Sequence, residues 1–130
     1  PEGLLASGGK QGEVTATVRV SPPDVTASAT PLELAVGDSF RLDALVQNKG
    51  DTRLTNVRAS ILFDTIGLRL RGSSGRNLGT IGPERTKLVR WRFKALERGN
   101  YVLVVSVEAL ERETGTLLHA QGSVIVVVVD

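Results

Sequence analysis

The stretch Val-Arg-Trp-Arg-Phe-Lys-Ala, residues 89–95, decides the fold class, because apolar and charged side chains alternate in it without a break. Successive side chains of a β-strand point to opposite faces of a sheet, so this period of two predicts a strand with one buried face. We expect Trp91 to pack in a core. A sugar-stacking role for Trp91 would require an exposed ring, and core packing is the better interpretation.

The same alternation recurs on both sides of this stretch. Glycine, asparagine, aspartate and proline separate the alternating segments, and no segment holds a 3.6-residue period with helix caps. This pattern predicts an all-β, immunoglobulin-like antiparallel β-sandwich of about seven strands, with an extra strand and arm at the N-terminus. The strand candidates are residues 13–20, 32–36, 40–46, 57–63, 68–71, 89–95, 101–110 and 117–129.

Two prolines, Pro22 and Pro23, end the first of these strands, because proline cannot donate to a β-ladder. We therefore divide the chain into an N-terminal arm with an extra strand, residues 1–24, and a sandwich, residues 25–130. Ordering the backbone of residues 13–20 costs on the order of 8–16 kcal/mol, so this strand needs a long edge to pair with. Its own domain or a neighbouring subunit could supply that edge.

The composition removes several kinds of chemistry. The 130 residues include no cysteine and one histidine, His119, which excludes thiol catalysis, disulfides and cysteine-based metal centres. The net charge is only +2 and the cations are interleaved with acids, so we expect no nucleic-acid partner. No run reaches the roughly 18 apolar residues that span a membrane, so we expect no membrane span.

The polar residues that could carry chemistry receive structural interpretations. His119 has no evident acid–base partner, and the loop of residues 73–75 lacks the motif of a nucleophile elbow. Four dispersed acids could be calcium ligands, but two of them lie in ordinary turns and turn capping explains them better. We therefore expect no enzyme activity, no cofactor and no metal site. The four acids are Asp38, Asp43, Asp51 and Asp64.

Two further features are also interpreted as structural. Tyr101 follows a glycine and an asparagine at a strand start, which predicts a corner tyrosine that hydrogen-bonds nearby backbone. The outward side chains of residues 89–95 form a basic ladder of Arg90, Arg92 and Lys94, with Arg69 and Arg71 of a similar type. We interpret the ladder as a solvated face whose cations pair across strands with acids, with two candidates: Asp43 and Glu108.

Several turn motifs resemble those of one domain family. Val36-Gly37-Asp38 precedes a strand, and Asn48-Lys49-Gly50-Asp51 predicts a turn, since asparagine and glycine tolerate positive φ. The segment Leu78-Gly79-Thr80-Ile81-Gly82-Pro83-Glu84 is similar to a turn of the type I-G-x-L-x-P-G-E, although Glu84 follows Pro83 without the glycine. Val89–Phe93 and Gly99-Asn100-Tyr101 complete the pattern.

With these motifs, residues 30–129 resemble the immunoglobulin-like modules of prokaryotic surface proteins, of the CARDB and NPCBM-associated kind. The resemblance covers about three quarters of the chain and is made of turns and alternation, so it bears on fold more than on function. It implies an extracellular or cell-surface module that binds, spaces or assembles, and it implies no catalytic residues.

The leading functional hypothesis is a structural subunit of an extracellular filament or surface assembly. Residues 124–129 are apolar on both faces, so a partner, the arm or a neighbouring subunit is expected to cover them. The alternative is that the sheet tolerates this run because β-branched residues suit strands. We expect a homopolymer that grows head-to-tail, each copy adding its strand 13–20 to the next by donor-strand complementation. The expected interface comprises the donor residues Val14, Ala16, Val18 and Val20, the acceptor-edge residues Val124, Val126 and Val128, and the arm residues Leu4 and Leu5.

The alternative is an adhesion or carbohydrate-binding immunoglobulin-like module of a larger surface protein. In that case residues 13–20 pair within their own chain, and the partners are glycans or other surface proteins. The two hypotheses therefore differ in where the first strand lies.

Overall fold

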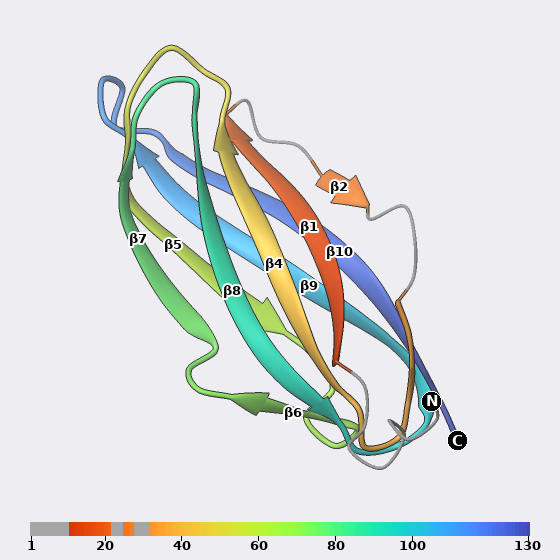
Figure 1. Cartoon of the computed structure of the whole chain (residues 1–130). Coiled ribbons are helices and arrows are strands. Elements are labelled where there is room, and N and C mark those ends of the chain that lie inside the picture. The colour runs from red at the N-terminus through yellow and green to blue at the C-terminus, as the bar shows by residue number, and fades with distance from the viewer. Residues whose placement is uncertain (1–10, 22–24, 28–31) are drawn as a thin grey trace.

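The computed structural model describes residues 11–21, 25–27 and 32–130, and these residues form ten strands in two packed sheets (Figure 1). The described residues contain no helix, so the predicted all-β sandwich is confirmed. The strands are β1 (Gln11–Ser21), β2 (Val25–Ala27), β3 (Leu32–Ala35), β4 (Ser39–Asn48), β5 (Leu54–Leu62), β6 (Leu68–Arg71), β7 (Gly75–Ile81), β8 (Arg85–Ala95), β9 (Gly99–Glu111) and β10 (Leu117–Val129).

One sheet has four strands in the order β1-β4-β8-β6, and the other has six, in the order β2-β10-β9-β5-β7 with β3 also on β10. From β4 onward every pairing is antiparallel, as expected. The N-terminal strands differ, because β1 is parallel to β4, and β2 and β3 are parallel to β10. Between β1 and β4 the chain forms β2 and β3 in the other sheet. β4 can therefore begin at the same end of the sandwich as β1 and run parallel to it.

Two strands lie where none is predicted. β2 is three residues long, too short to show a period. β7 carries few apolar residues, only Ile81 is buried in it, and Gly79 has a φ of 71°. Its ladder to β5 has two register irregularities. β7 is thus an edge strand held by its neighbours, which periodicity alone does not reveal.

The core is made by the inward side chains of both sheets, and most of its aromatic residues lie in the four-stranded sheet or beside it, whereas Tyr101 lies on β9 of the other sheet. Phe40 and Phe93 stack at 5.0 Å between ring centroids, and Phe63 meets Phe93 edge-on at 5.0 Å. Trp91 is completely buried, and its Nε1 donates to the Ser74 carbonyl at 3.1 Å. A buried indole cannot stack on a sugar, so the core interpretation of Trp91 is confirmed.

Asn48 shapes the β4–β5 turn by hydrogen bonds and not by a positive φ, which neither it nor Gly50 adopts. Its Nδ2 donates to the carbonyls of Thr52 at 2.8 Å and of Ile81 at 3.1 Å, and its Oδ1 accepts from Gly50 N at 3.0 Å. The turn is therefore present as predicted, but for a different reason. The buried amide ties this turn to the end of β7.

Glu84 occupies the position where the resembling family has glycine. Arg85 N donates to the Gly82 carbonyl at 3.2 Å, which closes a β-turn with Pro83 and Glu84 at its centre. The φ of Glu84 is 56°, in the left-handed region that disfavours residues with a Cβ atom. Glu84 thus occupies a turn position that favours glycine, and it carries the strain of that conformation.

Replacement of Glu84 by glycine is expected to stabilise the protein. Glycine adopts positive φ without the Cβ clash, so Glu84→Gly should raise the free energy of unfolding by about 0.5–1 kcal/mol. Denaturant unfolding of the wild type, Glu84→Gly and Glu84→Ala measures this. The alanine variant keeps the strain and should show no gain; an equal gain in both variants would contradict the assignment.

Tyr101 forms the predicted corner at the start of β9. Its hydroxyl donates to the Glu97 carbonyl at 2.7 Å, and its ring lies where a Cβ on Gly67 would fall, 2.1 Å from the hydroxyl oxygen. Burial raises the pKa of Tyr101 above its usual 10.0, and the nearby carboxylates of Asp64 and Glu97 raise it further. The folded protein therefore holds this proton more tightly than the unfolded chain does.

This pKa shift makes stability fall at high pH. The contribution of a raised pKa is complete below the unfolded value near 10 and is lost as pH rises through the folded-state pKa. Urea unfolding at several pH values should therefore show a steeper loss above pH about 10 for the wild type than for Tyr101→Phe. Tyr101 is the one tyrosine in the chain, so phenolate absorbance reports it alone. A phenolate that titrates at the unshifted value in the folded protein would contradict the expectation.

Candidate functional site

The first strand lies in the sandwich of its own chain. β1 runs along the edge of the four-stranded sheet, with Val14 beside Leu42 and Val18 beside Val46 on β4. The donor-strand hypothesis places the inward residues of β1 in a neighbouring subunit, whereas here they complete the domain that carries them. These buried residues are Val14, Ala16, Val18 and Val20. β1 is thus an integral strand of the sandwich, although the division at residue 24 sets it apart.

The residues expected to form an acceptor edge face the same core from the other sheet. β10 is paired with β9 on one side, and on the other side with β2 at residues 121–123 and with β3 at residues 126–129. Its inward residues Val124, Val126 and Val128 are buried. β1 and β10 pack face to face across the sandwich, so donor and acceptor residues meet within one chain. The arm residues Leu4 and Leu5 lie outside the described residues.

Two glycines make room for β1. A Cβ on Gly122 of β10 would lie 2.9 Å from the Thr17 carbonyl oxygen and 3.0 Å from Val18 Cγ2. At the end of the strand, a Cβ on Gly50 would lie 2.5 Å from Ser21 Oγ. Lys49 N also donates to the Ser21 carbonyl at 2.8 Å. Two glycines that are distant from β1 in the sequence, Gly122 on β10 and Gly50 in the β4–β5 turn, therefore leave the space that β1 occupies.

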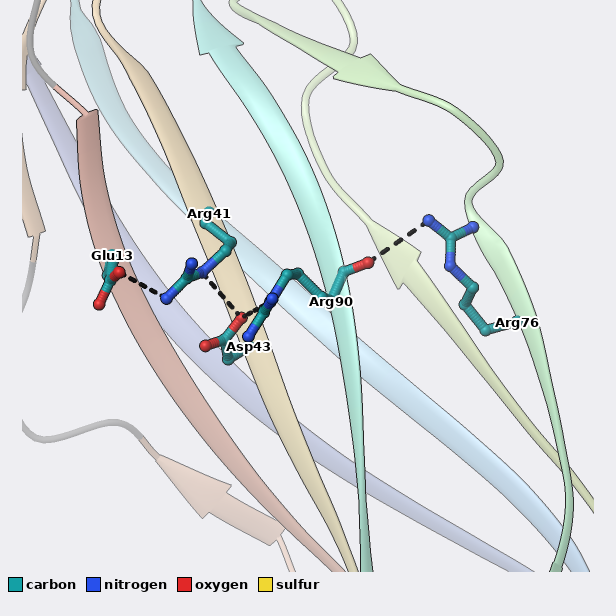
Figure 2. Close-up of polar contacts among 5 residues, drawn as sticks. All are labelled: Glu13, Arg41, Asp43, Arg76 and Arg90. Carbon is teal, nitrogen blue, oxygen red and sulfur yellow. Dashed lines mark hydrogen bonds and ion pairs between the residues drawn. The ribbon is translucent and has the colours of Figure 1, made fainter.

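A line of charged side chains joins β1 to the outer face of its sheet (Figure 2). Glu13 on β1 forms an ion pair with Arg41 on β4. Asp43 Oδ1 lies 3.2 Å from Arg41 Nε and 2.9 Å from Arg90 Nε on β8. Arg76 on β7 donates to the Arg90 carbonyl at 3.4 Å. Exposed pairs of this kind contribute a few tenths of a kcal/mol each. They therefore favour the observed register of β1 on β4 but add little to the stability of the fold.

One of the two acids predicted to pair with the basic ladder does so, and the other does not. Asp43 pairs with Arg90, as expected. Glu108 lies on β9 in the opposite sheet, where its Oε2 is 3.6 Å from Nδ1 of the exposed His119. The error arises because alternation gives the face of a side chain within its sheet but not which sheet holds the strand.

Two of the four dispersed acids cap turns, as predicted. Asp38 Oδ2 accepts from Ala35 N at 2.9 Å, and Asp64 Oδ1 accepts from Ile66 N at 2.8 Å. Asp43 belongs to the line of charges described above. Within the described ranges, no three histidine, aspartate or glutamate side chains come together in a group that could hold a metal ion.

The outer face of the six-stranded sheet carries an apolar patch that β9 and β10 share. Ile125 and Val102 are opposite each other in the ladder and are 40% and 58% exposed. Leu62 on β5 and Val129 on β10 are exposed as well, at 60% and 43%. The apolar run 124–129 thus faces the core with alternate residues and leaves this patch on the outside. Exposed apolar surface of this kind often marks a contact with another protein.

Comparisons with known proteins concern the fold. No protein-family model matches the chain, and no curated protein matches its sequence. Among solved structures it is similar to part of the E. coli alpha-2-macroglobulin, with a TM-score of 0.57 and 21% identity. That match covers 75% of this chain but only 6% of the macroglobulin, so the chain corresponds in size to one small portion of it.

The chain is also similar to the CARDB domain of a protein from Pyrococcus furiosus. The solution structure of that domain has a TM-score of 0.53 and 17% identity, covering 88% of this chain and 94% of the domain. Its crystal structure, a complex with di-metal ions, has a TM-score of 0.53 and 16% identity, covering 88% and 86%. At these identities the likeness shows the fold alone. This chain therefore has a CARDB-like, immunoglobulin-like fold, which confirms the resemblance inferred from the turns.

Nothing in the described part of the chain is a helix with the length and apolarity needed to cross a membrane.

The close approach of β1 to Gly122 can be tested by filling the space. Gly122→Val places methyl groups against the Thr17 carbonyl, and such overpacking should lower the free energy of unfolding by about 1–3 kcal/mol. Ser123→Val on the same strand is the control, because residue 123 points to the outer face, where a β-branched side chain suits the sheet. Denaturant unfolding compares the two. Equal effects would show that β1 does not lie on Gly122.

Proposed function

We propose that this chain is a non-catalytic adhesion or assembly module of a larger surface protein and works outside the cell. The observation that carries this proposal is the position of β1, which pairs with β4 and fills the core of its own sandwich. A domain complete in this way needs no second copy to fold. The fold supports the same conclusion, since similar structures include a CARDB domain and a small part of a macroglobulin.

The apolar patch around Val102 and Ile125 supplies a contact surface for such a module. The di-metal ions of the Pyrococcus domain have no counterpart in this proposal, because the described ranges hold no group of three side chains that could bind a metal ion.

A second candidate is the homopolymer in which copies exchange β1. The observation that favours it is that β1 is an edge strand, bonded in its sheet only to β4. The β1 of another copy could make the same contacts with β4 and Gly122, so exchange would preserve the packing and change only which chain supplies the strand. The copies would then associate head-to-tail, with Val14, Ala16, Val18 and Val20 crossing between subunits.

A cysteine pair distinguishes the two candidates. Thr17 and Leu45 are paired neighbours on β1 and β4, and adjacent strands lie about 4.8 Å apart, which suits a disulfide. The chain has no cysteine of its own, so Thr17→Cys with Leu45→Cys forms one defined bond. We expect oxidation to give a monomeric band on non-reducing gels, together with a monomeric mass in solution by light scattering.

The two single-cysteine variants are the controls, since they allow only collisional dimers. A ladder of covalent oligomers from the double variant alone would overturn the module and establish strand exchange. Val18→Asp then provides a second check, because it disrupts β1 in either arrangement. It should lower the free energy of unfolding of a self-contained module, whereas in a polymer it should release subunits.

A further inference from the structure

A block of four cations lies on the outer face of β6 and β8, at one end of the four-stranded sheet. Arg69 is opposite Lys94 and Arg71 is opposite Arg92 in the antiparallel ladder. The three arginines are exposed and the lysine is half-buried. In the sequence these residues form two short segments that are far apart. The sequence places Arg92 and Lys94 in a basic ladder and Arg69 and Arg71 in a separate segment, and the pairing of β6 with β8 brings the two together.

This block opposes the stability of the fold. Like charges directly opposite each other in a ladder are destabilising, and here two such pairs adjoin. Next to the block on the same face, Arg41, which is opposite Arg92, and Arg90 have the carboxylates of Glu13 and Asp43 as partners. The cations of the block form no ion pair or hydrogen bond with another described residue. Their unneutralised charge is complementary to an anion from outside the chain.

The spacing of the block suits a linear polymer with repeated negative groups. Strands lie about 4.8 Å apart, and side chains on one face repeat about every 6.8 Å along a strand. The cations therefore form a regular grid of two opposed pairs on adjoining strands. Arginine offers a planar fork of donors that matches carboxylate and sulfate groups in two-point contacts.

Other polyanions fit this face less well. Single-stranded nucleic acids are bound with exposed aromatic rings, but Trp91, Phe40 and Phe93 are buried in the core. The described residues offer no helix to enter a DNA groove. Protein interfaces are usually anchored by large aromatic side chains, and the grid carries none. A charged polysaccharide needs only the grid.

We propose that the outer face of β6 and β8 binds an acidic polysaccharide through Arg69, Arg71, Arg92 and Lys94. This inference rests on the proposed function, because it names the ligand class of the surface module. Carboxylates or sulfates of the polymer would lie between the paired cations and relieve their repulsion. The fully buried Trp91 takes no part, so recognition depends on charge spacing and not on stacking against sugar rings.

The test measures binding of the full chain to two probes, heparin as a sulfated polymer and polygalacturonate as a carboxylated one, by calorimetry at low salt. Arg71→Gln with Arg92→Gln removes one opposed pair and should weaken binding of at least one probe by about tenfold or more. The dependence of affinity on salt should also become less steep, because fewer counterions are exchanged. Unfolding by urea should show a stability equal to or above that of the wild type.

The matched control is Arg53→Gln with Arg112→Gln, which removes the same charge from turns at the opposite end of the sandwich (Figure 1). It should leave affinity within about twofold. Equal weakening in both double variants, or no binding of either polymer by the wild type, would overturn the proposal. Tighter binding of single-stranded DNA, or of vesicles of equal parts phosphatidylglycerol and phosphatidylcholine, with the same dependence on Arg71 and Arg92, would also overturn it in favour of that ligand.

The proposed function is tested separately. The cysteine pair on β1 and β4 reports whether the module is self-contained, whatever the polymers do. If the wild type bound neither polymer but the cysteine pair formed its disulfide within one chain, the proposed module would stand and only its proposed ligand would be wrong.

Discussion

The packing of β1 against β10 is the contact on which the rest of this sandwich depends. β1 closes one edge of the four-stranded sheet and at the same time covers the inner face of the other sheet. The contact is possible because Gly122 lets the β1 backbone approach to a distance that any side chain would prevent. Without β1, β4 would present an unpaired edge and the inward valines of β10 would lose their cover, and both are hazards for association. The self-contained character of the domain thus follows from one glycine and four small side chains.

Local alternation was sufficient to predict the strands that form the centre of the fold. Trp91 and Phe93 face inward and Arg90 and Arg92 outward, because a period of two leaves no other arrangement once one face is buried. β7 has no such pattern, since its apolar residues are few and its position is set by β5. The parallel pairing of β1 with β4 could not be predicted either, because it depends on the chain crossing to the other sheet, and no local motif indicates that crossing. Glu84 shows a third case, in which the turn was recognised and its strained φ was not.

The same limit applies to the functional surfaces. The sequence identified the apolar face of residues 13–20 correctly, but it could not tell whether that face fills its own domain or a neighbour. It identified Asp43 as a partner for Arg90 within one sheet, yet placed Glu108 on the wrong face of the molecule. It also identified the cations of the block on β6 and β8 as basic residues of an outer face, but it could not show that Arg69 lies opposite Lys94, because that is a matter of register. Pairing between distant strands is the information that a single sequence does not display.

The direction of β1 also bears on how the domain would respond to load. β1 begins, and β10 ends, at the same end of the sandwich, since Gln11 lies beside Ser39 and Val129 lies beside Ala35 (Figure 1). A pulling force applied between Gln11 and Asp130 would load the first residues of β1 and the last residues of β10, so the hydrogen bonds that join each strand to its neighbours within its own sheet would break one after another. The hydrogen bonds between strands loaded in this way break one at a time from the pulled end. When paired strands are pulled from opposite ends, all the hydrogen bonds between them must break together. Under such a load this domain would therefore yield early and lengthen.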